Sequence, residues 1–329
     1  MKKSGLKTIL VTGGGGYIGS HACKALADAG YLPITYDNFV YGHQSAVQWG
    51  PYYEGDICDR NSLAEAFELY QPEAVLHFAA YAYVGESVIN PGKYYRNNVV
   101  GSLTLLEVMR DYGVKKIIFS STCATYGLPA YSPIDEVHSQ RPISPYGASK
   151  LMIERIISDF EVAHDIKSIS LRYFNAAGAD PAGKIGEDHN PETHLIPLLF
   201  NVALGRTPAI TIFGSDYETS DGTCIRDYIH VADLADAHLK ALLFLEENMQ
   251  SQSFNLGGGR GYSVIEVIRE AEAVIGKKIQ FNFGARREGD APILVANSNK
   301  AKEMLSWAPN FPELKDILRT SWKWHSKNL

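Results

Sequence analysis

From Lys7 to His21 the sequence reads KTILVTGGGGYIGSH, an apolar run that leads into four consecutive glycines. Two glycine fingerprints fit this stretch: GxGxxG at Gly14, Gly16 and Gly19, and GxxGxxG at Gly13, Gly16 and Gly19. Both predict a tight turn between a strand and a helix, with backbone amides facing a dinucleotide pyrophosphate. A glycine pattern alone is weak evidence, and an acidic residue about 20 positions further on makes it specific.

Asp37 supplies that acidic residue, because it follows the apolar segment LPITY at 32–36. At the end of a second strand, a carboxylate accepts hydrogen bonds from the adenosine ribose. The next residues, NFVYG, contain no arginine or lysine to meet a 2′-phosphate, which favours NAD over NADP. Asp56 ends a third predicted strand, where it could meet the adenine ring. The alternative is a structural glycine turn with a surface aspartate.

Apolar, β-branched runs alternate with helical patterns through the first half of the chain. The predicted strands are 8–12, 32–36, 52–54, 74–78, 116–121 and 168–174, and the predicted helices are 18–29, 62–70, 94–112 and 146–164. This alternation predicts an α/β fold with a doubly wound parallel sheet, the Rossmann arrangement. After Asn175 a long loop rich in glycine, proline and charge precedes a mixture of short strands and helices. We therefore expect an NAD-binding domain over 1–175 and a smaller mixed α/β substrate domain over 176–329, with some elements returning to the first domain.

The amino-acid composition argues against nucleic-acid and membrane partners. The chain has 329 residues, 45% of them hydrophobic, and a net charge of −6, so it can form a large core but lacks the basic footprint of a nucleic-acid-binding protein. No apolar run approaches the roughly 20 residues that span a bilayer. The four cysteines form no CxxC motif, which indicates a reducing compartment without disulfides. We expect a cytoplasmic protein with no nucleic-acid or membrane partner.

Tyr146 and Lys150 in SPYGASK form a YxxxK pattern, which on a helix places both side chains on one face. A nearby ammonium lowers the pKa of a phenol, so such a tyrosine could act as a general base near neutral pH. Thr122, in SSTCATYG after a predicted strand, could hydrogen-bond the reacting oxygen. A second match, Tyr112 and Lys116, is interrupted by a glycine that should end the helix. The alternative for Tyr146 and Lys150 is a pair on a solvent-exposed helix face.

One loop gathers groups that could bind a metal. His189 and His194 lie among Glu187, Asp188 and Glu192 in GEDHNPETH. Their spacing fits no zinc pattern. We expect a solvated acidic loop with no metal, in which His194 lies near a substrate.

The sequence resembles the UDP-glucose 4-epimerases of the extended short-chain dehydrogenase/reductase family, from Thr12 to about Trp324. The motifs that carry this resemblance occur in the order TGGGGYIGSH, HFAAYAYVGES, NNVVGS, SSTCATYG, PYGASK, LRYFNAAGA, GTCIRDYIHVADLADAH, NLGGGRGYS and RREGD. The resemblance implies reversible C4 epimerisation of a UDP-sugar, such as UDP-glucose or UDP-galactose, through a 4-keto intermediate. It also implies tightly bound NAD, a role in galactose metabolism, and a homodimer built on helices such as 146–164.

The resemblance also implies roles for individual residues. The catalytic set would be Thr122, Tyr146 and Lys150. The cofactor-binding set would be Gly13, Gly16, Tyr17, Ile18, Gly19, Asp37, Asn38, Asp56, Ile57, Phe78, Ala79, Ala80, Asn98, Tyr146, Lys150 and Phe174. The substrate-binding set would be Thr122, Tyr146, Asn175, His194, Leu195, Arg226, Arg287 and Asp290, with both arginines at the diphosphate. Gly14 and Gly15 then become turn residues, where we expect some substitution to be tolerated.

Some positions depart from the family pattern, and other activities stay open. Thr122 stands where serine is commonest, Ala82 where lysine is frequent, and His194 where asparagine is common. A bulky Leu294 should disfavour N-acetylated sugars. A UDP-pentose 4-epimerase would use the same chemistry. A nucleotide-sugar 4,6-dehydratase would need an acidic residue near Thr122, where none occurs. A non-catalytic NAD sensor would tend to lose the tyrosine or the lysine.

Overall fold

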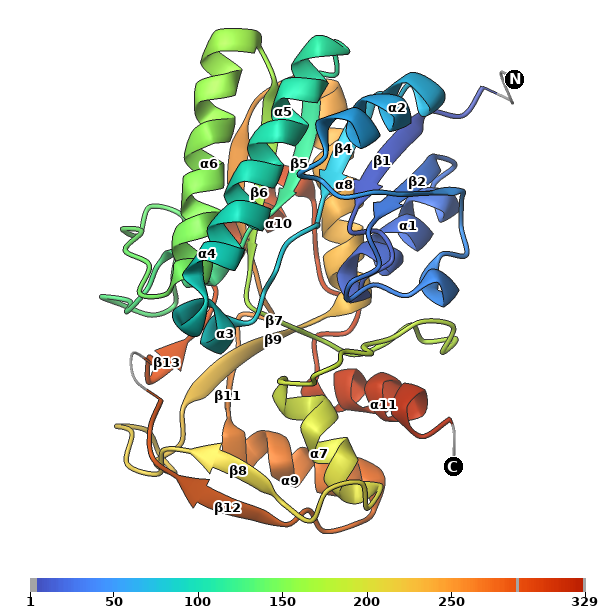
Figure 1. Cartoon of the computed structure of the whole chain (residues 1–329). Helices are drawn as coiled ribbons and strands as arrows, with labels where there is room; N and C mark the ends of the chain where they lie inside the picture. Colours follow the sequence, from blue (N-terminus) through green and yellow to red (C-terminus); the bar gives the residue numbers. More distant parts are fainter. Residues whose placement is uncertain (1–4, 288–289, 328–329) are drawn as a thin grey trace.

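The computed structural model describes residues 5–287 and 290–327. The larger part is a parallel sheet with helices on both faces, and a smaller part with short strands and helices lies at one end of it (Figure 1). Within the described residues, every helix is too short or too polar to span a bilayer.

Seven strands build the large sheet. They are β1 (Thr8–Thr12), β2 (Leu32–Asp37), β3 (Tyr52–Glu54), β4 (Ala74–His77), β5 (Lys116–Ser120), β6 (Lys167–Tyr173) and β10 (Gln252–Leu256). The order is β10-β6-β5-β4-β1-β2-β3, and every neighbouring pair is parallel. The doubly wound fold is therefore confirmed. Strand order reverses direction between β1 and β4, and in such sheets ligands bind at the carboxyl ends of the strands beside this switch point.

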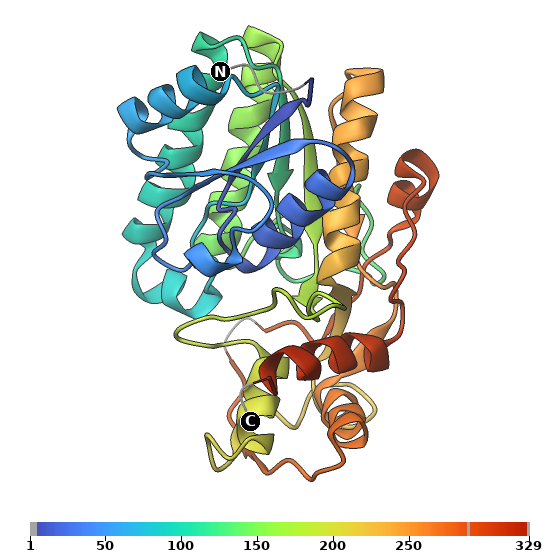
Figure 2. The ribbon, with the colours of Figure 1, turned by 90° about the vertical axis from the view of Figure 1, so that its right-hand side faces the viewer.

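Helices cover both faces because the central strands are apolar on both sides. One face carries α1 (Tyr17–Asp28), α8 (Val231–Asn248) and α10 (Asn299–Leu305), and the other carries α2 (Arg60–Tyr70), α5 (Gly101–Asp111) and α6 (Pro145–His164). Figure 2 shows this layering from the side. Each face forms a separate apolar cluster with the sheet between them.

The prediction of a single helix over 94–112 is wrong in its detail. The chain forms α3 (Val84–Ile89), α4 (Pro91–Tyr94), a π-helical stretch η2 (Tyr95–Val100) and then α5. The π stretch carries Asn98, whose amide points inward to Tyr81 and Ser149. Such wide turns inside helices often occur at functional sites.

The smaller part surrounds its own apolar cluster, whose buried members run from Ala177 to Leu318 along the chain. Its elements are β7 (Asn175–Ala177), α7 (Leu195–Ala203), β8 (Ile210–Phe213), β9 (Ile225–His230), β11 (Gly261–Ser263), α9 (Val264–Ile275), β12 (Phe281–Gly284), β13 (Ile293–Leu294) and α11 (Leu314–His325). Two 3-10 turns, η1 (Gln44–Ala46) and η3 (Cys123–Thr125), lie in the larger part. Because α8 and β10 return to the large sheet, the two parts are interleaved along the chain. The domain boundary at residue 175 stays a prediction.

Candidate active site

The glycine turn joins β1 to α1 and requires glycine for two different reasons. Gly13 has a φ of +74°, and a Cβ there would lie 2.7 Å from the Ala79 nitrogen. At Gly19 a Cβ would lie 2.1 Å from the Gly13 oxygen, so the helix can approach the turn only without a side chain. Gly16 is less crowded, because a Cβ there would lie 3.3 Å from the Gly13 oxygen. It is the N-cap residue of α1. The turn therefore leaves helix amides open to an anion.

The expectation that Gly14 and Gly15 tolerate substitution is wrong. A Cβ at Gly14 would lie 2.7 Å from Thr35 Oγ1 on β2. At Gly15 it would lie 2.8 Å from Cε1 of Phe39. Both glycines are enclosed by the second strand and the loop that follows it, which the local glycine pattern does not reveal.

Asp37 is the last residue of β2, whereas the sequence pattern placed it just after the strand. Its carboxylate accepts hydrogen bonds from the backbone amides of Gly15, at 2.9 Å, and Phe39, at 2.8 Å. Burial raises its pKa, and these two hydrogen bonds oppose the shift. Asn38 donates to the Asp56 carboxylate at 3.0 Å, so the three polar residues predicted for the adenosine half lie together.

The other predicted cofactor residues line the same strand ends. The amides of Phe78 and Ala79 both donate to the Thr12 carbonyl, at 2.9 and 3.0 Å, and Ala80 follows them. Ile18 packs against one core cluster and Ile57 belongs to the other. Their assignment to the cofactor remains a prediction.

Tyr17 and Asn98 make contacts that the sequence did not reveal. The Tyr17 hydroxyl donates to the Gly178 carbonyl at 2.7 Å and so joins the glycine turn to the long loop after β7. The buried Asn98 amide accepts from the Tyr81 amide and donates to the Tyr81 carbonyl and to Ser149 Oγ. Asn98 thereby ties the segment after β4 to α6.

Tyr146 and Lys150 lie on the first turns of α6, which Ser144 caps by accepting from the Gly147 amide. Lys150 Nζ donates to the Ser120 carbonyl at 2.8 Å and lies 4.9 Å from the centre of the Phe119 ring. Both side chains of the pair are buried. The helix thus places the YxxxK pair against the carboxyl end of β5.

Burial dominates the protonation of this pair. It raises the pKa of Tyr146 far above its ordinary value, while the Thr122 hydroxyl acts in the lowering direction. It also lowers the pKa of Lys150 to about 7. The expected lowering of the phenol pKa by the lysine does not appear in the protein alone, because burial outweighs the other influences on the pKa of Tyr146.

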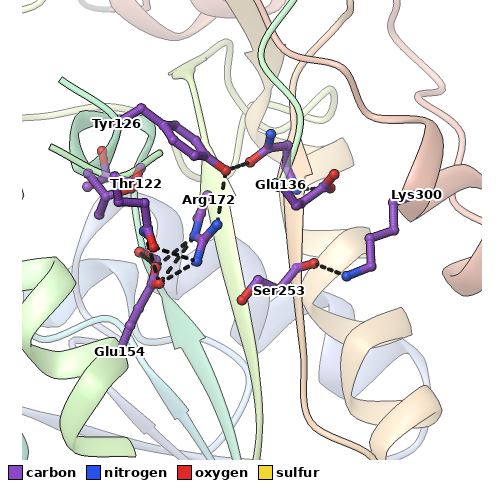
Figure 3. A network of polar contacts seen from close by, with 11 residues as sticks. Thr122, Tyr126, Glu136, Glu154, Arg172, Ser253 and Lys300 are labelled. Atoms are coloured by element: carbon purple, nitrogen blue, oxygen red, sulfur yellow. Dashed lines mark hydrogen bonds and ion pairs between the residues drawn. The ribbon is translucent and has the colours of Figure 1, made fainter. Parts of the chain in front are cut away.

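A buried polar network supports the strand end that carries Thr122 (Figure 3). Arg172 on β6 forms an ion pair with Glu154 on α6, at 2.6 Å from Nη2 to Oε2. Glu154 also accepts from Ser121 Oγ at 2.5 Å, and Arg172 donates to the Tyr126 hydroxyl at 3.0 Å. This pair was not predicted, although Arg172 inside an otherwise apolar strand is a signal that the sequence contains.

The predicted substrate residues approach from the smaller part. Arg226 on β9 donates to the Ala291 carbonyl and pairs with Asp290, and Asn175 donates to the Asp227 carbonyl at 3.1 Å. Arg287 is exposed, with its guanidinium 4.2 Å from the centre of the Phe213 ring, and its carbonyl accepts from the Asp290 amide at 3.3 Å. The other predicted residues occupy defined places: Phe174 is buried beside Tyr126, His194 precedes α7 and Leu195 begins it.

The loop before α7 is exposed at Asp188 and His194, as expected for a solvated acidic segment, but it buries Glu187. Glu187 is only 2% exposed, and its Oε1 lies 2.7 Å from His194 Nδ1 and 3.2 Å from His189 Nδ1. The carboxylate raises the pKa of His194, and the histidines lower the pKa of Glu187. Burial therefore governs Glu187, whereas His194 pairs with it from the solvent-exposed side.

The second YxxxK match behaves as the sequence predicts. Tyr112 is the residue at which α5 ends, Gly113 follows with a φ of +71°, and Lys116 begins β5. The two side chains do not share a helix face.

Known proteins resemble this chain over nearly its whole length. A UDP-glucose 4-epimerase of Rhizobium leguminosarum bv. trifolii is 51% identical over 322 residues, which cover 98% of each chain. The crystal structure of UDP-glucose 4-epimerase from Brucella ovis in complex with NAD matches with a TM-score of 0.94 and 50% identity, covering 96% of this chain and 98% of that one. The Bifidobacterium longum enzyme in complex with NAD⁺ and UDP matches with a TM-score of 0.92 and 37% identity, covering 98% and 99%.

Residues 9–257 match the NAD dependent epimerase/dehydratase family. That span contains the glycine turn, Asp37, Thr122 and the pair formed by Tyr146 and Lys150. The chain therefore belongs to the NAD dependent epimerase/dehydratase family.

Proposed function

We propose that the protein is an NAD-dependent UDP-glucose 4-epimerase, which interconverts UDP-glucose and UDP-galactose in the galactose metabolism of the cytoplasm. The observation that carries the proposal is the position of Tyr146 and Lys150 against the end of β5, at the same sheet edge as the glycine turn. Relatives such as the Rhizobium leguminosarum protein bear this name. The four cysteines are free thiols, which accords with a reducing compartment.

The residues present fit a bound dinucleotide. A Cβ at Gly13 or Gly19 would collide with backbone, so the turn stays close enough for its amides to meet a pyrophosphate. Asp37 ends β2 with a carboxylate held by two amides, as a ribose-binding acid requires. Bound at this turn, NAD would supply a reversible acceptor for the hydride of sugar C4.

In the proposed reaction Tyr146 removes the proton of the sugar 4-hydroxyl and later returns it. Thr122 stabilises the phenolate form, as its effect on the Tyr146 pKa indicates. The positive charge of oxidised nicotinamide would favour the same form, which burial alone disfavours. Lys150 is fixed by the Ser120 carbonyl, so its ammonium has a defined place at this strand end. The keto group then has to present its other face before the hydride and proton return.

A nucleotide anchor allows that reorientation. The Arg226 guanidinium is pre-oriented by the Asp290 carboxylate and the Ala291 carbonyl, which leaves other N–H donors for phosphate oxygens. We assign Arg287 and Asn175 to the same UDP site. While these groups hold the nucleotide, the smaller sugar group can rotate.

The proposed overall reaction needs no added cofactor, which can be tested directly. Purified protein mixed with UDP-galactose should form UDP-glucose without added NAD, because the hydride is returned in every turnover. Chromatographic separation of the two sugars measures the conversion, and UDP-pentoses in parallel test the pentose alternative. A protein with NAD demonstrably bound that converts no UDP-hexose would contradict the proposal.

We further propose that the protein is a homodimer. An apolar groove between η2 and α6 is lined by Tyr95, Val99, Val100 and Met152, together with Gly92 and Arg96. Val100 and Met152 are 50% and 45% exposed, which is unusual for large apolar side chains that meet in one groove. A second copy of the same helix pair would cover this surface.

A single charge placed in this apolar groove should dissociate the proposed dimer. Met152→Glu should convert a particle of twice the chain mass into a monomer, because it places a carboxylate in the apolar groove. Sedimentation velocity measures the mass. Val162→Glu is the matched control, since Val162 is 87% exposed on the same helix but does not line the groove. A wild-type monomer, or equal dissociation by both variants, would refute the proposed interface.

A further inference from the structure

Four side chains of the loop between β7 and α7 converge on one point. Glu187, His189, Glu192 and His194 each place one ligand atom so that all four atoms lie within 4.8 Å of one another. Glu187 is 2% exposed, and the His189 and Glu192 side chains are 18% and 11% exposed. The His194 side chain is 48% exposed, so the cluster is buried at Glu187 and reaches solvent at His194.

Two buried atoms of this cluster lack hydrogen-bond partners. Within the described residues, no hydrogen bond reaches Glu187 Oε1 or His189 Nδ1, although these two atoms are 3.2 Å apart. His194 Nδ1 is 2.7 Å from the same Glu187 oxygen, but its hydrogen bond is directed to Glu192 Oε1, at 3.2 Å. These contacts are close but poorly directed as hydrogen bonds, so a ligand placed between the two atoms can supply the partner that each lacks.

The charge of the site is only partly balanced. In the described part of the chain, no lysine or arginine nitrogen lies within 4 Å of Glu187 or Glu192. Glu192 Oε1 accepts from the Thr193 and His194 amides, at 2.7 and 2.8 Å, whereas among these described residues the buried Glu187 carboxylate has only the two histidines beside it. A buried carboxylate needs a cation or several hydrogen bonds to offset the cost of leaving water. In the metal-free protein a protonated His194 offsets part of this charge. As metal ligands the two imidazoles would be neutral, and the four groups would then carry a net charge of −2, which a divalent cation would balance.

We propose that Glu187, His189, Glu192 and His194 form a binding site for one divalent transition-metal ion, with Zn²⁺ as the best fit. Imidazole nitrogens and carboxylate oxygens are the donors that zinc accepts, at about 2.0–2.2 Å. Tetrahedral ligands at that distance lie about 3.3–3.6 Å from each other. The Nδ1 and carboxylate oxygen pairs lie at 2.7, 3.2, 3.2 and 3.8 Å, with either oxygen of Glu192, and the whole ligand set lies within 4.8 Å. Side-chain shifts of up to about 1 Å would therefore bring four ligands to the tetrahedral spacing.

The ion would fix a loop that borders the proposed active site. The His189 ring packs edge-on against Tyr17, with centroids 6.1 Å apart, and against Tyr83, at 6.2 Å. Tyr17 belongs to the end of the glycine turn, and His194 directly precedes α7. A metal at this place would therefore join the turn, the loop and α7 without touching Tyr146 or Lys150. This revises the sequence-based expectation of no metal, which rested on spacing alone.

Calorimetric titration of the full-length protein with ZnCl₂, after removal of metal by chelation, tests the site. We expect saturable binding of one ion per chain and a rise in melting temperature on zinc addition. His189→Ala should weaken binding by at least about 100-fold, because even partners outside the ligand set change metal affinity by 10–100-fold. This variant removes no hydrogen bond from Nδ1, so it is expected to fold.

Asp188→Asn is the matched control, because this acid lies in the same loop with a side chain that is 69% exposed and outside the cluster. It should bind zinc as tightly as the wild type, whereas Glu187→Gln should not. The proposal would be overturned by the absence of a one-to-one site in the wild type. Equal zinc affinity of wild type and His189→Ala would also overturn it, since the ion would then lie elsewhere.

Discussion

Replacing Tyr146 by phenylalanine is expected to lower kcat for UDP-galactose by about 10²–10⁴-fold, the range that general acid–base catalysis contributes. The change removes one oxygen atom and leaves the ring that α6 buries at this position. UDP should bind with unchanged affinity, because the residues proposed to hold it lie on β7, β9 and the segment before β13. Initial rates measure the first quantity, and calorimetry with UDP measures the second.

Tyr112→Phe provides the internal control for this experiment. Tyr112 belongs to the same sequence pattern but lies 43% exposed at the end of α5. Its replacement should leave kcat within about twofold of the wild type, as expected for an exposed residue away from the site. If both variants kept normal turnover, Tyr146 could not be the proton acceptor, and the proposed mechanism would fail.

The features that could be predicted from the sequence depend on short stretches of chain. The strand before the glycines, the turn and the helix after it lie within Thr8–Asp28, and their order is confirmed. The alternation of apolar runs with helical patterns was enough to place six of the strands in the large sheet. Local periodicity carries this information because the central strands are covered by helices on both faces, which makes them continuously apolar.

Features that depend on distant contacts could not be predicted in this way. Gly14 is crowded by Thr35 and Gly15 by Phe39, and both neighbours come from a separate strand and its loop. The π stretch at Tyr95–Val100 follows from an inward-pointing Asn98, which helical periodicity treats as one more polar residue. In each case the tertiary contact decides the local structure.

The cluster of Glu187, His189, Glu192 and His194 in the loop between β7 and α7 could not be predicted from the sequence either. This loop has neither strand nor helix periodicity, and the spacing of its histidines and acids matches no zinc pattern. Only the folded loop brings Glu187 and His194 within 2.7 Å. The protonation of Tyr146 was misjudged for a related reason, since the pairing with Lys150 was visible in the sequence but the burial of both groups was not.

Removal of the Glu154 carboxylate is expected to produce the largest loss of stability. The Glu154 and Arg172 side chains are 9% and 7% exposed, so Glu154→Ala would leave the guanidinium buried without its counter-charge. Breaking a buried ion pair in this way costs about 3–5 kcal/mol. The same carboxylate accepts from Ser121, next to Thr122, so the strand end at the proposed active site should loosen as well. Urea unfolding, with saturating NAD in every sample, measures the free energy of unfolding.

Arg155→Ala is the matched control on the same helix. Its partner Asp159 lies 3.2 Å away, but the two side chains are 77% and 58% exposed, and such pairs contribute below about 1 kcal/mol. The double variant Glu154→Leu with Arg172→Met should recover part of the loss, because it removes both charges and keeps apolar volume. Equal unfolding free energies for Glu154→Ala and Arg155→Ala would show that the buried pair does not hold α6 against β6. The expected recovery in the double variant would show that the lost stability comes from the unpaired guanidinium and not from the missing carboxylate itself.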